Sequence, residues 1–428
     1  MQTAMGSRYY PLWLKLFLSL IGLTLISSGF AQINSQIGGP DAEVRRLLQE
    51  GDIQLRRGMF EEAEMMYTQA IEIDYSNAKS YMKRANLYRI MSRYQESMRD
   101  YNKAVSLNPY SEYVYDERAK LKMLAMDYQG ALEDITKAIS IQPQNHELRD
   151  HRIEDYLTIG AYEKALADID TLLQSDYNKP DALIKGALLN ILLEDYTAAV
   201  IQVDSALIYE PNNSIAYDIL GLLELKQENY RAAVNAFSQA IAINPKFTIA
   251  YYNRGLAYRY LGKIEQSMND LNQAIAINQD LEVIFFTRAL VRKELGDLNG
   301  AVKDYEKALE LDPNYSEALY NKAFTFKMMG DYSSALNEVD QIVEDDPASK
   351  ESWNLKGNIH TLFGDYRAAK RAYTEAILLD ANYAEGYYNR GLSQIMGQYT
   401  SNGCADLRKS AELNFKKAAH ALRNLCNQ

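Results

Sequence analysis

The chain has 428 residues, of which 47% are apolar, and its formal net charge is −11. An acidic chain without a basic stripe argues against a nucleic-acid ligand and against direct binding to anionic membrane surfaces. The apolar fraction is ample for an extended core.

Residues 1–31 are predicted to be a secretory signal. Arg8 and Lys15 precede an apolar run from Leu16 to Ile26, and Gly29-Phe30-Ala31 places small residues where a bacterial-type signal peptidase reads them. The mature chain is therefore expected to begin at Gln32, in the periplasm or elsewhere in the cell envelope.

An uncleaved membrane anchor is the alternative interpretation of this segment. The apolar run is shorter than the ~20 residues that a membrane span needs, but Trp13 and Leu14 could extend it. After the signal, residues 32–43 contain Gly38-Gly39-Pro40 and are expected to form a short flexible lead.

A pattern with a period of 34 residues follows, from Val44 to Tyr383, without an insertion or deletion. Position 20 of each repeat is never larger than Ser, position 27 is mostly Ala, and position 8 is mostly Gly or Ala. Ten repeats fit, and their first residues are Val44, Ala78, Glu112, His146, Pro180, Ser214, Thr248, Glu282, Ser316 and Lys350.

Each repeat is predicted to be a helical hairpin. Apolar residues recur at helical spacing on either side of a break that often holds Gly, as at Gly262 and Gly330. The second helix then ends at an acidic or amide residue that is usually followed by Pro, as at Asn244-Pro245. One hairpin cannot bury its apolar faces alone, so stacking of neighbouring repeats forms the core.

The repeats closely resemble the tetratricopeptide repeat family, over about four fifths of the chain. The family pattern has Gly or Ala at position 8, Ala at 20 and 27, and Pro at 32, and the stretch from Tyr251 to Tyr258 matches it almost letter for letter. The resemblance implies an all-α, right-handed superhelical solenoid of about eleven hairpins with a C-terminal capping helix. It also implies a concave face, lined by the first helices, that holds a protein or peptide segment.

Residues 384–428 are expected to form a shortened eleventh repeat and a capping helix. We predict helices over Ala384–Met396, Asn402–Leu413 and Lys416–Leu425. Cys404 and Cys426 lie eleven residues either side of Phe415, at matching heights of an antiparallel hairpin, so a disulfide is geometrically reasonable. Two buried free thiols are the alternative.

Neither an enzyme nor a cofactor is indicated. The histidines His146, His151, His360 and His420 lack the spacing of metal ligands on one helix face, and no phosphate loop or nucleophile elbow is present. We therefore predict no catalytic, metal or cofactor site and no small-molecule substrate.

The candidate partner-binding groove follows the family's concave positions 2, 5, 9 and 12. In repeats five to nine these positions carry apolar and aromatic residues, which predicts an exposed strip that binds a partner. The alternative is that neighbouring helices bury many of them and the strip is narrower. The candidate residues are Ile184, Leu188, Ile215, Leu222, Ile249, Tyr252, Leu256, Val283, Phe286, Leu290, Tyr320 and Phe324.

The early repeats place charged or polar residues at the same positions. They are Lys79, Asn86, Arg89, Asp116, Lys120, Glu147, Asp150 and Glu154. The groove is thus expected to change from charged to apolar along the chain.

Two further features bear on function. Relatives that clamp the carboxylate terminus of a cytosolic chaperone use a set of Lys, Asn and Arg residues that no three successive repeats carry here, so that partner is disfavoured. The fourth repeat departs most from the pattern, with Ile153 at position 8 and Leu172 at position 27, and predicts a change of curvature near residues 146–180. Simple drift of the repeat is the alternative.

The leading hypothesis is a non-enzymatic scaffold of the periplasm or envelope that grips an extended or helical protein segment in its C-terminal half. The second hypothesis is an accessory subunit of an envelope enzyme or of a transport or secretion assembly. In both, contact with a membrane would come only through partners or an uncleaved signal.

Overall fold

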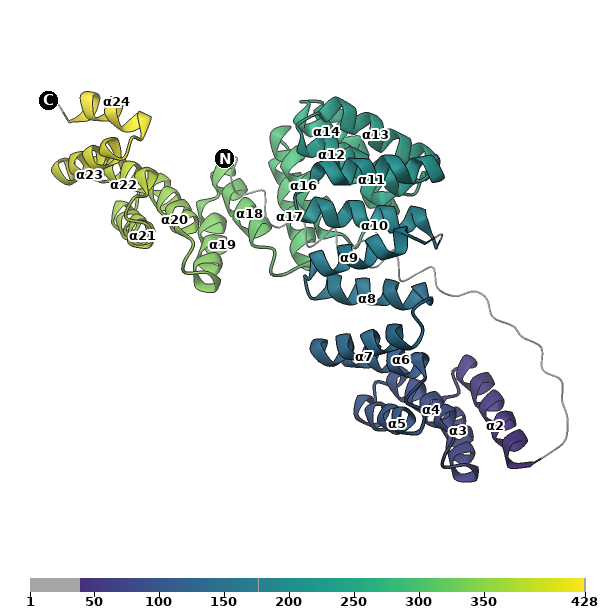
Figure 1. Cartoon of the computed structure of the whole chain (residues 1–428). Coiled ribbons are helices and arrows are strands. Elements are labelled where there is room, and N and C mark those ends of the chain that lie inside the picture. Colours follow the sequence, from purple (N-terminus) through teal and green to yellow (C-terminus); the bar gives the residue numbers. More distant parts are fainter. Residues whose placement is uncertain (1–38, 176, 427–428) are drawn as a thin grey trace. The chain divides into compact units, whose positions relative to one another are not determined.

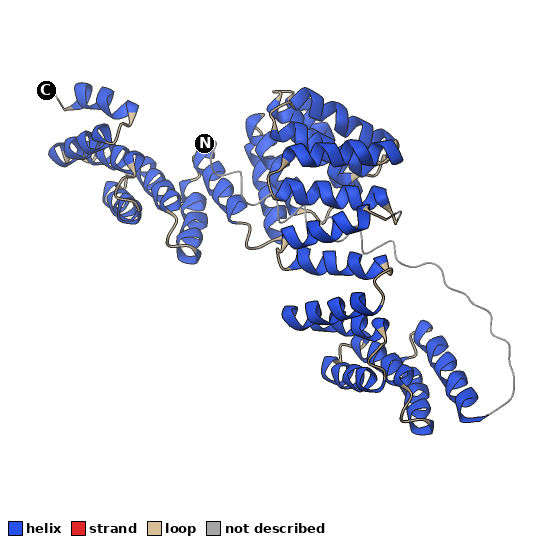
Figure 2. Cartoon of the chain, viewed as in Figure 1, coloured by secondary structure: helices blue, strands red, loops and turns tan. Residues whose placement is uncertain are grey.

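The computed structural model describes residues 39–175 and 177–426, and these form two compact units (Figure 1). The described residues up to Pro211 form the N-terminal unit, and those from Asn212 onward form the C-terminal unit. All secondary structure within the described residues is helical, without a strand (Figure 2). The all-α repeat solenoid predicted from the sequence is confirmed. The predicted signal segment lies outside the described residues.

The N-terminal unit contains the first five hairpins. Its helices are α2 (Gly39–Arg56), α3 (Phe60–Ile73), α4 (Ala78–Ile90), α5 (Tyr94–Leu107), α6 (Glu112–Leu124), α7 (Tyr128–Ile141), α8 (His146–Thr158), α9 (Tyr162–Leu173), α10 (Lys179–Leu192) and α11 (Tyr196–Tyr209).

The C-terminal unit contains the remaining hairpins and the capping helix. Its helices are α12 (Ser214–Lys226), α13 (Tyr230–Ile243), α14 (Thr248–Tyr260), α15 (Ile264–Ile277), α16 (Glu282–Glu294), α17 (Leu298–Leu311), α18 (Ser316–Met329), α19 (Tyr332–Asp345), α20 (Lys350–Phe363), α21 (Tyr366–Leu379), α22 (Ala384–Met396), α23 (Thr400–Glu412) and α24 (Lys416–Leu425).

Helix boundaries follow the sequence period closely. Most first helices begin at the first residue of a repeat, and α22 and α24 have the predicted bounds. Other boundaries differ. Helix α2 begins at Gly39, so residues 39–43, expected to be part of a flexible lead, are helical, and α23 begins at Thr400 instead of Asn402.

The turn inside each hairpin has a left-handed residue at position 15. Six repeats place Gly there, for example Gly330 with φ 79°. Other repeats accept a residue with a side chain at the same position, such as Met126 (φ 60°) and Glu228 (φ 63°). Left-handed backbone costs a residue with Cβ more than it costs Gly, so position 15 fixes the turn and explains the recurrent glycine.

Small residues let the two helices of a hairpin approach each other. Ala233 and Ala240 on α13 are fully buried, and a Cβ added at Gly221 would lie 2.5 Å from the ring of Phe237. The buried aromatic at position 24 therefore occupies the space that the small residue at position 8 leaves. This packing is the physical reason for the pattern of small residues in the sequence.

A bidentate ion pair between position 7 of the first helix and position 23 of the second recurs in both units. The Arg nitrogens donate to the two Asp oxygens at 2.6–3.0 Å, and the pairs are Arg84–Asp100, Arg118–Asp134, Arg152–Asp168, Arg254–Asp270, Arg288–Asp304 and Arg390–Asp406. The carboxylates are mostly buried, so each pair satisfies a charge that would otherwise be costly to bury.

The fourth repeat accommodates its unusual residues in the core. Ile153 and Leu172 are fully buried and share a cluster with Ile169 and Leu189. The larger side chains at positions 8 and 27 therefore pack without exposing apolar surface. The change of curvature expected near residues 146–180 stays a prediction.

The C-terminal end is closed by a disulfide. Cys404 on α23 and Cys426, just after α24, are bonded, with their Cα atoms 5.8 Å apart. Ala418 and Ala421 of α24 are buried. The bridge therefore holds the capping helix against the last hairpin.

Candidate protein-binding surface

The first helices of each unit line one side of the repeat stack. In the C-terminal unit, α12 packs against α14, α14 against α16, α18 against α20, and α20 against α22, whereas comparable contacts between successive second helices are not found in the described chain. First helices are thus closer to one another than second helices are. They form the inner side of the curve within this unit, as the resemblance implied.

Most of the predicted groove residues are buried by this packing. None of the twelve candidate side chains is exposed. The fully or nearly buried ones are Ile184, Leu188, Tyr252, Leu256, Val283, Phe286 and Leu290. The remaining candidates are half-buried: Ile215, Leu222, Ile249, Tyr320 and Phe324. The expected broad apolar strip is therefore corrected to a narrow one, as the alternative interpretation held. Binding of a partner by the twelve residues stays a prediction.

Phe286 is the clearest correction. Its side chain is 5% exposed and belongs to a core cluster with Ala301 and Tyr305. Its ring centroid lies 4.9 Å from that of Tyr315 and 5.9 Å from that of Tyr305. Phe286 is thus a core residue whose ring packs between Tyr305 and Tyr315 and is not available to a partner.

Tyr320 and Phe324 are the aromatic candidates that keep accessible surface. Both lie on α18 and are packed only in part against the cluster that contains Leu319 and Leu355. Burial raises the pKa of the Tyr320 phenol to about 12, with a smaller contribution from Glu385. The hydroxyl therefore stays protonated and can donate a hydrogen bond to a bound segment.

Two lysines flank Phe324. The Nζ atom of Lys327, one helical turn along α18, lies 4.0 Å from the Phe324 ring centroid. The Nζ atom of Lys293 on α16 lies 5.5 Å from the same centroid and donates to Asn321 Oδ1 at 3.0 Å. An aromatic face with two cations beside it can hold a segment that combines apolar and acidic groups.

In the N-terminal unit, the charged residues of the first helices pair with one another. Lys120 Nζ lies 2.8 Å from both Asp116 Oδ2 and Glu117 Oε1, and Asp116 Oδ1 lies 2.8 Å from His151 Nδ1. Burial lowers the pKa of His151, but the hydrogen bond to Asp116 and its charge outweigh burial, so the net shift is upward. The charged surface predicted here is thus largely self-compensated.

The pairing has a regular spacing that the sequence analysis missed. Position 5 of one repeat contacts position 6 of the next, 35 residues on, as in Asp150–Lys185 at 3.0 Å and in Asp116–His151. In the C-terminal unit the same spacing joins Asp218 to Asn253. A search for complementary polar residues 35 apart could have found these pairs.

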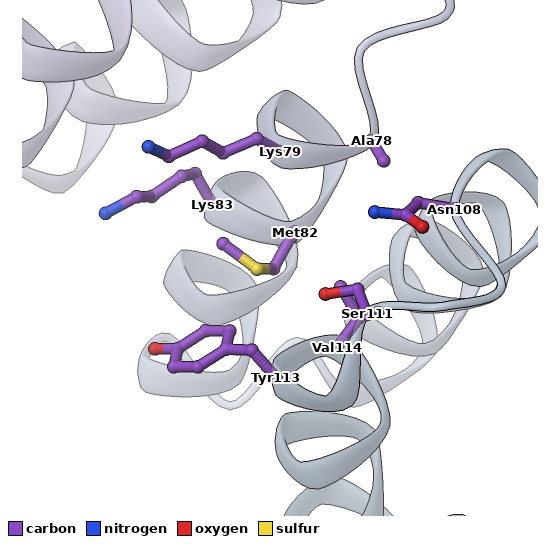
Figure 3. A pocket seen from close by; sticks show the side chains of 8 residues that line it. All are labelled: Ala78, Lys79, Met82, Lys83, Asn108, Ser111, Tyr113 and Val114. Atoms are coloured by element: carbon purple, nitrogen blue, oxygen red, sulfur yellow. The ribbon is translucent and has the colours of Figure 1, made fainter. Parts of the chain in front are cut away.

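A pocket of about 440 Å³ opens between α4 and α6 in the N-terminal unit (Figure 3). Lys79 and Lys83 extend along one side of it and Tyr113 lies on the other (Figure 3). Lys83 Nζ already pairs with Asp52 Oδ2 at 2.8 Å, and Lys79 is exposed. The pocket thus lies on the side of this unit that the first helices line.

The described residues lack the features of two other classes of site. They contain no group of three or more His, Cys, Asp and Glu placed to hold a metal ion. No described helix is both long enough and apolar enough to cross a membrane.

Comparison with known families identifies the repeats. Models described as tetratricopeptide repeat match residues 44–77, 78–111, 248–281, 293–359 and 350–383, and one described as TPR repeat matches residues 221–259. The chain belongs to the tetratricopeptide repeat family. This fold is generally that of a non-enzymatic scaffold for protein–protein interaction.

Several solved structures are similar in fold. A tetratricopeptide repeat protein from Parabacteroides merdae is 20% identical, with a TM-score of 0.45 over 58% of this chain and 99% of that one. The APC/C hetero-tetramer Cut9–Hcn1 is 13% identical (TM-score 0.46, 91% and 97% covered). YrrB, described as a TPR protein with an unusual peptide-binding site, is 18% identical (TM-score 0.38, 44% and 99% covered). Among curated proteins, none matches this chain.

Proposed function

We propose that this protein is a non-enzymatic scaffold of the bacterial periplasm or envelope that binds a partner segment along the first helices of its C-terminal unit. The observation that carries the proposal is the half-buried pair Tyr320 and Phe324 on α18, beside Lys293 and Lys327. Aromatic side chains that keep accessible surface in a packed setting are the usual anchors of protein interfaces.

The proposed location rests on two observations. Residues 1–31 have the pattern of a secretory signal, which would be removed before Gln32. A disulfide joins Cys404 and Cys426, and such bonds persist in oxidising compartments such as the periplasm. Intact-mass measurement of the envelope-purified protein tests the first point, because detection of Met1 would contradict a cleaved signal.

A second candidate function is an accessory subunit of an envelope assembly. Exposed apolar side chains recur where the first helices end, in repeats nine to eleven. Met328 is 50% exposed, Leu362 55%, Phe363 60% and Met396 57%. An apolar row of this kind favours broad packing against other subunits.

Co-purification from crosslinked native cells distinguishes the two functions. The full chain would be compared with a Tyr320→Ala/Phe324→Ala variant and a Leu362→Ala/Phe363→Ala variant, and captured proteins identified by mass spectrometry. The scaffold proposal expects one stoichiometric partner that is lost with the first variant only. A large set of subunits lost only with the second variant would contradict it and favour the assembly.

A further inference from the structure

Lys293 and Lys327 occupy the same place in successive repeats of the C-terminal unit. Each is at position 12, in the last turn of a first helix, and each is half-buried. Their ammonium groups lie beside one ring, that of Phe324, at 5.5 and 4.0 Å from its centroid. Two cations from neighbouring helices therefore converge on one aromatic residue of the inner surface.

Neither lysine forms an ion pair with a described carboxylate. Lys293 donates only to the neutral Asn321, whereas other half-buried lysines are paired, as Lys120 is with Asp116 and Lys322 with Glu338 at 2.9 Å. The contrast is notable in a chain with an excess of acidic residues. Burial of a cation without a counter-charge costs free energy that an anionic ligand would restore.

The titration of the two lysines agrees with this contrast. Burial lowers the pKa of Lys327 and outweighs the opposing charge of Glu385. Burial and the nearby charge of Arg259 lower the pKa of Lys293 and outweigh the opposing charge of Glu294. Lys120 is also buried, yet its carboxylate neighbours raise its pKa. The carboxylates near Lys293 and Lys327 thus compensate these lysines less than Asp116 and Glu117 compensate Lys120.

We propose that Lys293 and Lys327 form a carboxylate-binding site for an acidic residue of the partner segment, with Phe324 packing against an apolar neighbour of that residue. This inference rests on the proposed function and specifies its partner as an acidic, apolar protein segment. The family's tail-clamp residues are absent here, so these position-12 lysines would act in their place by a different geometry.

A protein carboxylate fits the surroundings better than a phosphate does. Arginine is the side chain that suits bidentate phosphate binding, and Arg259, whose charge acts on Lys293, is engaged with Glu294 through its Nε at 2.9 Å. The apolar surfaces of Phe324 and Tyr320 continue from the two lysines along α18. A segment that alternates acidic and apolar residues would use both features.

The probe for the test is a fluorescein-labelled hexapeptide of alternating glutamate and leucine, and binding to the full mature chain is followed by fluorescence anisotropy. We expect the Lys293→Gln/Lys327→Gln variant to bind the probe roughly ten-fold or more weakly. The control is Lys303→Gln/Lys370→Gln, which replaces two exposed lysines on second helices. It removes the same amount of positive charge as the test variant. The control should bind like the unmodified chain.

Each other outcome has a defined meaning. If both lysine double variants bind the probe equally weakly, or if neither binds it more weakly than the unmodified chain, the proposed site is wrong. Displacement of the probe by millimolar inorganic phosphate, but not by chloride at equal ionic strength, would reassign it to phosphate and overturn the carboxylate assignment. If the lysine variant still captures the native partner normally, the site is wrong but the scaffold stands. If the Tyr320→Ala/Phe324→Ala variant captures it normally, the scaffold proposal itself fails.

Discussion

Asn253 donates its side-chain amide to both carboxylate oxygens of Asp218, at 3.1 and 3.3 Å, inside the C-terminal unit. The carboxylate is 1% exposed, and burial raises its pKa to about 7, although the Asn253 hydrogen bond opposes the shift. Four repeats further on, the same positions hold Asn389 and Asn354, joined at 3.0 Å. The fold thus already contains an uncharged version of this contact.

The first prediction follows from the raised pKa of Asp218. Its pKa in the unfolded chain is near 3.8, so the folded chain binds more protons between about pH 4 and 7, and stability falls as the pH rises through that range. The gain in unfolding free energy from Asp218→Asn should be about 2–3 kcal/mol larger at pH 8 than at pH 5. Urea unfolding at both pH values measures it. An identical gain at pH 5 and pH 8 would show that the carboxyl titrates normally.

The second prediction concerns Phe286 and Phe324, which the sequence placed in one groove. Because Phe286 packs against Tyr305 and Tyr315, Phe286→Ala should lower the free energy of unfolding by about 3–5 kcal/mol, through lost burial and a cavity. Phe324→Ala should cost much less, since Phe324 is half-buried. Thermal unfolding compares them, with Phe237→Ala as a core control. A Phe286→Ala melting temperature equal to that of the unmodified chain would refute the core assignment.

The third prediction uses the turn residue Met126. It has φ 60° and is 75% exposed, in a position where other repeats have Gly with no neighbour within 4 Å of a built Cβ. Met126→Gly should therefore relieve left-handed strain and stabilise the chain by about 0.5–1 kcal/mol. The reverse change, Gly160→Ala, serves as the control and should destabilise. Chemical denaturation measures the change in unfolding free energy of each variant. A loss of stability in Met126→Gly would contradict the presence of left-handed strain at this turn.

The fourth prediction concerns the bridge between Cys404 and Cys426. The unreduced protein should run faster than the reduced protein on a denaturing gel. Removal of the disulfide should lower the free energy of unfolding by about 3 kcal/mol, because the open chain gains entropy when unfolded. Because the bridge closes the end of the stack, the loss should appear first as faster hydrogen exchange in α24. Unchanged exchange in α24 of a Cys404→Ser/Cys426→Ser variant would argue against this role.

The hairpins could be predicted from the sequence because each depends on local signals. Position 15 needs a left-handed backbone, positions 8, 20 and 27 need small side chains, and Pro follows the second helix, so a period of 34 residues fixes the helix order. The bounds of α22 and α24 were predicted on this basis. Most of these signals act within a hairpin, whereas the small residue at position 27 also packs against the next repeat, as Ala240 does in its cluster with Ala250.

The accessible part of the groove could not be predicted in the same way. Phe286 and Tyr320 both occupy position 5, yet the first is buried and the second is half-buried. Tyr315 covers Phe286, whereas the equivalent residue one repeat later is the small Ser349. Exposure therefore depends on a residue about 30 positions away, which a list of concave positions does not include.

The lysines beside Phe324 were missed for another reason. Position 12 is among the family's concave positions, but the pattern that predicted the groove in repeats five to nine consists of apolar and aromatic residues, and Lys293 and Lys327 are neither. What distinguishes them is the lack of a carboxylate partner among the described residues, and the sequence alone does not show which charges are paired.

The most direct test of the central claim is site-specific photo-crosslinking in native cells. A benzoylphenylalanine would replace Phe324 on the inner surface, and, as the control, the exposed Lys303 on the second helix α17. We expect a light-dependent adduct with one protein from position 324, mapping to an acidic segment of that protein, and no adduct from position 303. The absence of an adduct from position 324, or the same adducts from both positions, would contradict it.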